Sequence, residues 1–185
     1  GTVSKSLAPA LRLGWAVLPD WLAGPVGAAK QVADRGAPAL DQLALATLVE
    51  SGRYDRHLRR LKSRVQAGVQ AVTARVEASF PAGTRVSAPR AGFLLWVELP
   101  RQVNALEVHR RALELGIGVS PGPLFSSRSD LPNHLRLNCA NEPTPRLLGA
   151  VGQVGEICRG LVEGAAARQG AQVGQPTSSR AARAP

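Results

Sequence analysis

The chain has 185 residues, of which 44% are hydrophobic and 19% charged, so it can bury a core and is not expected to stay unfolded. Its two cysteines exclude a disulfide-rich framework, and it has no uncharged apolar run of about 18 residues, the length that a membrane span requires. No signal-like segment opens the sequence. We therefore expect a globular, cytoplasmic protein without membrane contact.

The formal net charge of +10 is concentrated in two segments. Residues 53–64 carry six basic residues against the single acid Asp55, and residues 164–185 add three arginines and no acid. An excess of this kind also occurs in nucleic-acid-binding modules, whose affinity would be sensitive to salt. For residues 53–64 we favour a solvated helix face over a DNA contact, because an apolar stripe runs beneath the basic positions.

The first third of the chain is predicted to hold one strand and two short helices. Residues 1–10 form a loop that contains Ser, Gly and Pro, and the apolar residues 11–18 that follow predict a buried strand. Asp20 can cap a helix that runs to about residue 32. After a Gly and Pro break, a second helix is expected over about residues 38–49.

Residues 53–80 are predicted to form one long amphipathic helix, because apolar residues recur there at steps of three and four. The apolar positions are Tyr54, Leu58, Leu61, Val65, Val69, Val72, Val76 and Phe80. At about 1.5 Å per residue, such a helix is longer than most helices within one domain, so we expect it to link two parts of the structure. A domain boundary near Gly52 follows.

Beyond this helix, strands and helices alternate, which predicts a small α/β or α+β domain that ends near residue 163. The expected strands are residues 84–87, 92–99, 116–120 and 134–140, and the expected helices are residues 105–115 and a last helix that starts at Pro145 with Thr144 as its cap. Residues 164–185 are rich in Ala, Gly, Gln, Ser and Arg, and this composition predicts a disordered tail.

The first fifteen residues, GTVSKSLAPALRLGW, carry the motif with the clearest chemistry. A lysine amine forms imines readily when desolvation or a nearby positive charge lowers its pKa, and Lys5 lies among small and apolar residues with Arg12 further along. The hydroxyls of Thr2 and Ser4 and the guanidinium of Arg12 suit charge-assisted hydrogen bonds to a phosphate. A lone Ser-Lys pair would be an ordinary surface feature, but the whole run argues for a function.

This run closely resembles the cofactor-lysine segment of the fold-type-I (class I/II) pyridoxal-phosphate-dependent aminotransferases. The resemblance implies that Lys5 holds pyridoxal 5'-phosphate as a Schiff base and later moves the proton between substrate and cofactor. It also implies that Thr2, Ser4 and Arg12 bind the cofactor phosphate. Val3 departs from the family pattern, which more often has an aromatic residue at this position.

A second run, NHLRLNCA at residues 133–140, resembles the strand whose arginine binds the substrate carboxylate in this family. The resemblance implies this role for Arg136, since a guanidinium can donate two parallel hydrogen bonds to a carboxylate. Taken alone, an arginine between two leucines would more often be a strand residue that reaches solvent. Residues 91–100 and 118–125 also look like the small-domain strand and the substrate-side loop, so the resemblance covers roughly residues 1–161.

The family's fold gives an expected domain organisation. By the resemblance, the chain is α/β: residues 1–51 are the end of the cofactor-binding large domain, and residues 52–163 are the long linking helix and the small C-terminal domain. Because the chain has no methionine and opens within a motif, we expect a C-terminal fragment. We also expect this fragment to bind cofactor poorly and to be inactive on its own.

Two functions remain open. The first is an aminotransferase that moves an amino group between an amino acid and a 2-oxo acid, as a homodimer when full length. The second is suggested by residues 50–61, which are most similar to the MocR-type regulators of the GntR family. There, a winged-helix domain that is absent from this chain would bind DNA, and this domain would sense pyridoxal phosphate or an amino acid. The three histidines have no metal-ligand spacing, so no metal is expected.

Overall fold

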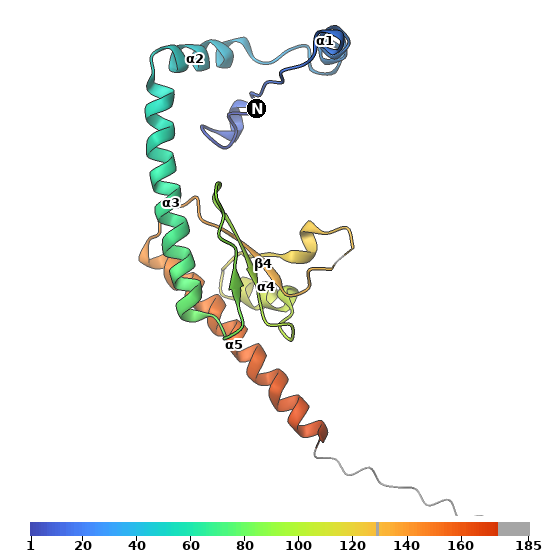
Figure 1. Cartoon of the computed structure of the whole chain (residues 1–185), viewed down its shortest axis with the longest axis vertical. Coiled ribbons are helices and arrows are strands. Elements are labelled where there is room, and N and C mark those ends of the chain that lie inside the picture. The colour runs from blue at the N-terminus through green and yellow to red at the C-terminus, as the bar shows by residue number, and fades with distance from the viewer. Residues whose placement is uncertain (129, 174–185) are drawn as a thin grey trace, which may run out of the picture. The chain divides into compact units, whose positions relative to one another are not determined.

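The computed structural model describes residues 1–128 and 130–173, and the chain divides into two compact units (Figure 1). The first unit is Gly1–Ser63 and the second is Arg64–Pro185. The division falls within α3 (Arg53–Ser79), which is one continuous helix, as its apolar stripe predicted. The predicted boundary near Gly52 lies at the start of this helix, and the assignment of domains stays a prediction.

The first unit contains the two predicted short helices. They are α1 (Asp20–Asp34) and α2 (Ala39–Glu50), and both predictions are confirmed to within two residues at each end. Helix α1 ends at Asp34 because the next two residues have positive φ angles, 56° at Arg35 and 103° at Gly36, which do not continue a right-handed helix. Neither helix has a buried residue in the structure.

The predicted buried strand over residues 11–18 is wrong. Leu11 ends a 3-10 helix (Pro9–Leu11), and the side chains of Trp15 and Val17 are 56% and 93% exposed. Residues 1–63 are all described, and within them residues 11–18 form β-bridge pairing at one position, the isolated antiparallel bridge of Gly14 with Thr2. An extended segment becomes a strand only when neighbouring strands satisfy its backbone groups, and apolar composition alone does not reveal whether such neighbours exist.

The second unit is built around an antiparallel sheet in the order β1-β2-β4-β3. Its strands are β1 (Arg85–Val86), β2 (Leu94–Glu98), β3 (Ser120–Pro121) and β4 (His134–Asn138). All four coincide with predicted strands, but the predicted strand over residues 116–120 is reduced to its last residue and Pro121. The antiparallel sheet with helices around it places this unit in the expected class.

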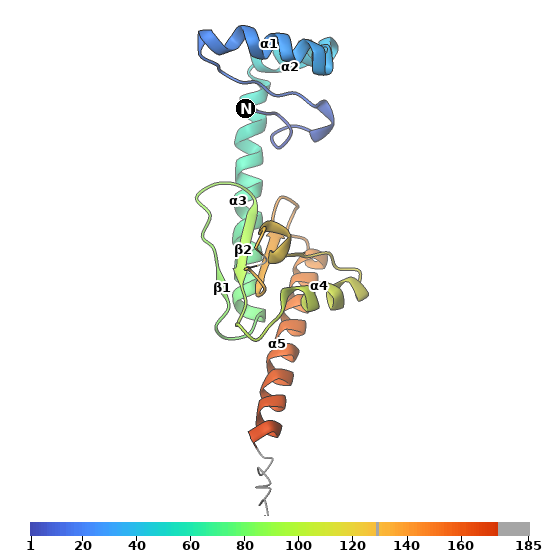
Figure 2. The same ribbon diagram turned by 90° about the vertical axis from the view of Figure 1, so that its right-hand side faces the viewer.

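Alternation along the two central strands separates a buried face of the sheet from an open one. Leu95 and Val97 of β2 pair with Leu137 and Leu135 of β4, and all four are buried. They form one core with residues from α3, α4 (Ala105–Glu114) and α5 (Pro145–Val173). Helices α4 and α5 contact each other, as Figure 2 shows. The helical core residues include Val72, Val76, Val108, Ala112, Val154 and Cys158.

A close approach of backbones fixes the end of β4 against α3. A Cβ atom added at Gly68 would overlap the carbonyl oxygen of Cys139, which follows β4 directly. Cys139 also donates its backbone N–H to Phe93, at 2.7 Å. The residue type at position 68 therefore decides how closely the helix can lie beside the strand that carries Arg136.

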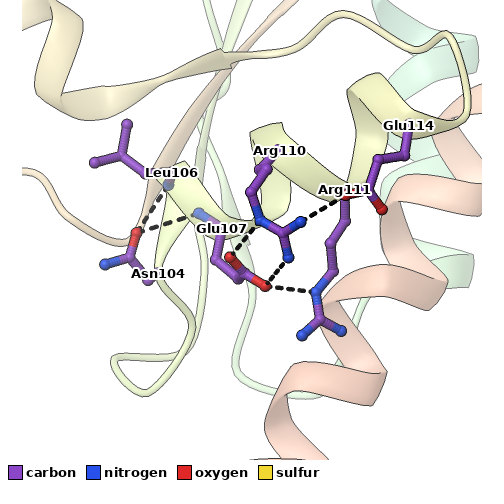
Figure 3. A network of polar contacts seen from close by, with 6 residues as sticks. All are labelled: Asn104, Leu106, Glu107, Arg110, Arg111 and Glu114. Carbon is purple, nitrogen blue, oxygen red and sulfur yellow. Dashed lines mark hydrogen bonds and ion pairs between the residues drawn. The ribbon is translucent and has the colours of Figure 1, made fainter.

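The predicted helix over residues 105–115 is confirmed as α4, and Figure 3 shows how its first turns are held. The side chain of Asn104 caps the helix by accepting from the backbone N–H groups of Leu106 and Glu107, at 2.9 and 3.4 Å. Glu107 in turn accepts from Arg110 and Arg111 at 2.7–3.0 Å. These hydrogen bonds, first that of Arg110, lower the pKa of Glu107 to about 2.

The last helix is longer than predicted. Thr144 caps α5 as expected, since its Oγ1 accepts from the backbone N–H of Leu147 at 3.3 Å. The helix continues to Val173, so residues 164–173 of the predicted disordered tail are helical, in keeping with the high helix propensity of their alanines. Residues 174–185 of that tail lie outside the described residues. In the described part of the chain, none of the helices has the length and apolarity that crossing a bilayer requires.

Candidate functional site

Lys5 lies in a tight turn over residues 3–7. The backbone N–H groups of Ser6 and Leu7 both donate to the carbonyl of Val3, at 3.2 and 2.8 Å. Val3 and Leu13 are buried beneath the turn, whereas the side chain of Lys5 is exposed. The turn therefore presents its amine at the surface of the first unit, on a backbone that the buried Val3 anchors.

Backbone pairing joins this turn to the segment around Arg12. The backbone N–H of Val3 donates to the Leu13 carbonyl at 3.2 Å, next to the Thr2–Gly14 bridge. A Cβ atom at Gly14 would come within 2.8 Å of the Gly1 carbonyl oxygen, so the pairing requires glycine there. The pairing closes a loop over residues 4–12, which begins with Ser4, contains Lys5 and ends with Arg12.

The two hydroxyls of the motif contact each other. Thr2 Oγ1 lies 2.9 Å from the Leu13 carbonyl oxygen and 3.0 Å from Ser4 Oγ, and it accepts from the Ser4 backbone N–H at 3.2 Å. A hydroxyl has a single hydrogen to donate. When Thr2 donates to the Leu13 carbonyl, the Ser4 hydroxyl can donate to an anion outside the loop.

Arg12 adopts the left-handed conformation, with a φ of 50° and a ψ of 30°, directly after the short 3-10 helix. For a residue other than glycine this conformation costs of order 1 kcal/mol. Its side chain is exposed. The hydroxyl of Ser4, the primary amine of Lys5 and the guanidinium of Arg12 thus belong to one closed loop, and these donors suit a ligand that carries both a phosphate dianion and an aldehyde. The residues present therefore fit pyridoxal phosphate.

Sequence reasoning missed two residues that contact this turn from the start of α3. The hydroxyl of Tyr54 lies 2.9 Å from Ser6 Oγ, and Nε2 of His57 lies 2.6 Å from the Ser6 carbonyl oxygen. Their spacing of three residues puts them on one face of a helix, and this was readable in the sequence. Their partner was not, because Ser6 is about fifty residues away along the chain.

Arg136 belongs to the second unit, where it lies on the open face of the sheet. In the antiparallel register it stands between Trp96 on β2 and Ser120 on β3. Its guanidinium carbon lies 4.0 Å from the centre of the Phe125 ring, a cation–π contact. The ring of Phe125 meets that of Trp96 edge-on, with 5.7 Å between the centroids and 74° between the planes.

Two further features surround Arg136. Nδ1 of His134 is buried and has no hydrogen-bond partner among the described residues, while its ring lies 5.5 Å from that of Trp96. Arg136 also borders a cavity of about 340 Å³ whose lining is mainly apolar. The other polar residues that line the cavity are Ser120, Asn138 and Asn141.

The structure thus places Ser4, Lys5 and Arg12 on one closed loop, with Thr2 in the bridge beside it, and it places Arg136 in the second unit with its own neighbours. Residues 1–128 and 130–173 contain no group of three His, Cys, Asp or Glu side chains that could hold a metal ion. Cys139 and Cys158 are free and buried. Burial raises the pKa of their thiols to about 11 and about 12.

Known proteins with similar sequences are of two kinds. The chain is 36% identical, over 83% of its length, to an uncharacterized HTH-type transcriptional regulator, YjiR, of Escherichia coli K12. It is 30% identical, over 88% of its length, to the 2-aminoadipate transaminase of Thermus thermophilus. No family model matches the chain.

Solved structures show the same relationship. LysN, the alpha-aminoadipate aminotransferase of Thermus thermophilus, in complex with N-(5'-phosphopyridoxyl)-L-leucine, matches 88% of the chain with a TM-score of 0.80 and 30% identity. The chain spans about a third to two fifths of the length of these relatives, between 32% and 42%. It therefore belongs to the family that comprises the fold-type-I pyridoxal-phosphate aminotransferases and the aminotransferase-like domains of MocR-type regulators.

Proposed function

We propose that the protein containing this chain transfers an amino group between an amino acid and a 2-oxo acid, with pyridoxal phosphate held on Lys5. The observation that carries the proposal is the closed loop that contains an exposed lysine amine, the Ser4 hydroxyl and a guanidinium, with the Thr2 hydroxyl 3.0 Å from that of Ser4. The likeness to an aminotransferase whose structure contains a phosphopyridoxyl amino acid supports it. The substrate amino acid is left unspecified.

Each residue of the loop has a distinct part in this proposal. The bound cofactor would supply an aldehyde for the covalent link and a conjugated ring that draws electrons from the substrate. Lys5 Nζ would hold the aldehyde carbon of the cofactor and would move a proton to and from the substrate carbon. Ser4 and Arg12 would hold the phosphate by charge-assisted hydrogen bonds, and Thr2, which donates to the Leu13 carbonyl and lies 3.0 Å from Ser4 Oγ, would orient the Ser4 hydroxyl.

Arg136 would bind the substrate carboxylate. A guanidinium presents two parallel N–H groups that match a carboxylate, and the Phe125 ring holds the group from one side. Two parallel hydrogen bonds would leave the carboxylate little freedom to turn.

A second function is favoured by the 36% identity to an HTH-type transcriptional regulator. In that case, the same loop and arginine would bind pyridoxal phosphate and an amino acid as an effector, and a DNA-binding domain outside this chain would respond. The two functions differ in turnover: an aminotransferase releases a 2-oxo acid repeatedly, whereas a sensor reacts at most once for each bound cofactor.

Assembly and location are part of the proposal. The exposed apolar side chains of the first unit include Trp21, Val32, Leu40 and Leu43, which a larger fold or a second copy would cover. We infer a homodimer for the full-length protein, as is usual in the family. The two free, buried thiols agree with a cytoplasmic location.

The proposal is tested with protein expressed from the complete reading frame. Wild type should show visible cofactor absorbance that falls when the correct amino acid is added, with release of a 2-oxo acid, and Lys5→Ala should abolish both signals. Lys30→Ala is a matched control, because Lys30 is an exposed lysine of the same unit that pairs with Asp34. A second 2-oxo acid is supplied together with the amino acid, because the amino group must be passed to an acceptor before the next turnover. Release of the product 2-oxo acid in excess of protein then supports the enzyme, whereas a single equivalent supports the sensor. Unchanged absorbance in Lys5→Ala contradicts both.

A further inference from the structure

Hydrogen bonds of one residue, Ser6, join the turn that carries Lys5 to helix α3 of the same unit. Residues 4–8 form two described hydrogen bonds with residues beyond position 15. Both of these bonds join Ser6 to a residue of α3. One joins the hydroxyls of Ser6 and Tyr54 at 2.9 Å, and the other joins the Ser6 carbonyl oxygen to His57 Nε2 at 2.6 Å. We call these three residues the Ser6 clamp.

The chemistry of the groups sets the direction of one bond and favours that of the other. A carbonyl oxygen only accepts, so His57 must donate through a protonated Nε2. The Ser6 hydroxyl also lies 3.5 Å from the Val3 carbonyl oxygen, to which it can donate weakly. Tyr54 would then donate to Ser6. The clamp thus holds both the side chain and the backbone of the residue that directly follows Lys5.

We propose that Tyr54 and His57 are positioning residues for Lys5, which hold its turn in the conformation that presents the amine to an aldehyde. This inference rests on the proposed function, since it assigns the two residues to the orientation of the same amine. Neither residue touches the cofactor in this proposal. They act through Ser6, and α3 provides the rigid support because it is a continuous helix of 27 residues.

The clamp predicts a local effect. An orientated lysine reacts faster than one on a mobile turn, because the turn does not have to be ordered when the covalent link forms. Loss of one hydrogen bond should slow the capture of pyridoxal phosphate roughly 5-fold, and loss of both more than 10-fold. Buried elements of the second unit do not take part in these contacts, so their stability should not change.

The test uses the full-length protein with its cofactor removed and then added back. Tyr54→Phe removes the phenol hydroxyl and keeps the ring, and His57→Leu removes the donor at similar volume. His57→Gln keeps an N–H donor at similar reach and should restore most of the capture rate. Lys62→Ala, an exposed change on the same helix, is the matched control. Hydrogen exchange of the Ser6 and Leu7 amides, which both bond to the Val3 carbonyl, gives a readout that is independent of activity.

The inference predicts faster exchange at Ser6 and Leu7 and slower capture in Tyr54→Phe and His57→Leu, with unchanged exchange in α5 and recovery in His57→Gln. It is overturned if capture requires Lys5 but both variants match wild type in capture rate and in exchange at these amides. It is also overturned if His57→Gln is as slow as His57→Leu. Wild-type capture that survives Lys5→Ala would instead overturn the proposed function.

Discussion

The guanidinium of Arg136 lies over the ring of Phe125, with its central carbon 4.0 Å from the ring centroid. The two residues come from different elements, β4 and the 3-10 helix Gly122–Phe125, and Trp96 packs edge-on against the same ring. Because a ring face attracts a cation, Phe125 restricts the directions in which Arg136 can point. A carboxylate that approaches from the opposite side would meet a guanidinium that is already oriented.

Phe125→Leu should therefore raise the KM for the amino acid substrate by roughly 2- to 5-fold, in line with the strength of cation–π contacts at exposed sites. Arg136→Gln should raise it further, by roughly 10- to 100-fold, because hydrogen bonds to a charged group are lost. Steady-state kinetics of the full-length protein measures both. A Phe125→Leu protein with wild-type KM, beside an Arg136→Gln protein with a raised one, would show that the ring does not orient the arginine.

Gly68→Ala should lower the free energy of unfolding by about 1–3 kcal/mol, because the added methyl group meets the Cys139 carbonyl and forces α3 away from β4. Gly160→Ala in α5 is the matched control, since an added Cβ there contacts nothing within 4 Å. It should raise the free energy of unfolding by about 1 kcal/mol through helix propensity. Urea titration followed by circular dichroism distinguishes the two. Equal effects would contradict the close approach of α3 and β4.

The thiols of Cys139 and Cys158 should not react with alkylating reagents at neutral pH while the protein is folded. Both are fully buried, and burial raises their pKa values to about 11 and about 12, so the reactive thiolate is scarce. Iodoacetamide labelling followed by peptide mass spectrometry checks this, with the urea-unfolded protein as the control. Rapid labelling of the folded protein would show that the core opens around these residues.

Glu107 should stabilise the fold above about pH 4.5, and this contribution should fall as the pH drops to about 2. Its pKa is about 2 in the folded state against an ordinary value of 4.5, so the unfolded chain takes up a proton first in that range. Thermal unfolding of wild type and Glu107→Gln should therefore differ at pH 7 and converge near pH 2. Glu156→Gln, at an exposed glutamate of α5, is the control. A difference that is independent of pH would contradict the network in Figure 3.

The helices were predictable because each depends on a local signal. The apolar stripe from Tyr54 to Phe80 gave α3 almost to the residue, and Thr144 with Pro145 gave the start of α5. The strand over residues 11–18 failed because a strand depends on partners elsewhere. The site divides in the same way: the Lys5 motif is contiguous, whereas the surroundings of Arg136 depend on the pairing of β4 with β2, which brings Trp96 beside it from forty positions away.

The central claim is that Lys5 forms the covalent link to the cofactor. It is tested most directly by reducing the full-length holoprotein with borohydride and mapping the phosphopyridoxyl group by peptide mass spectrometry. The account predicts one modified residue within this chain, Lys5, with Lys30 and Lys62 unmodified. A label on another lysine, or no label on a protein that retains its cofactor, would contradict it.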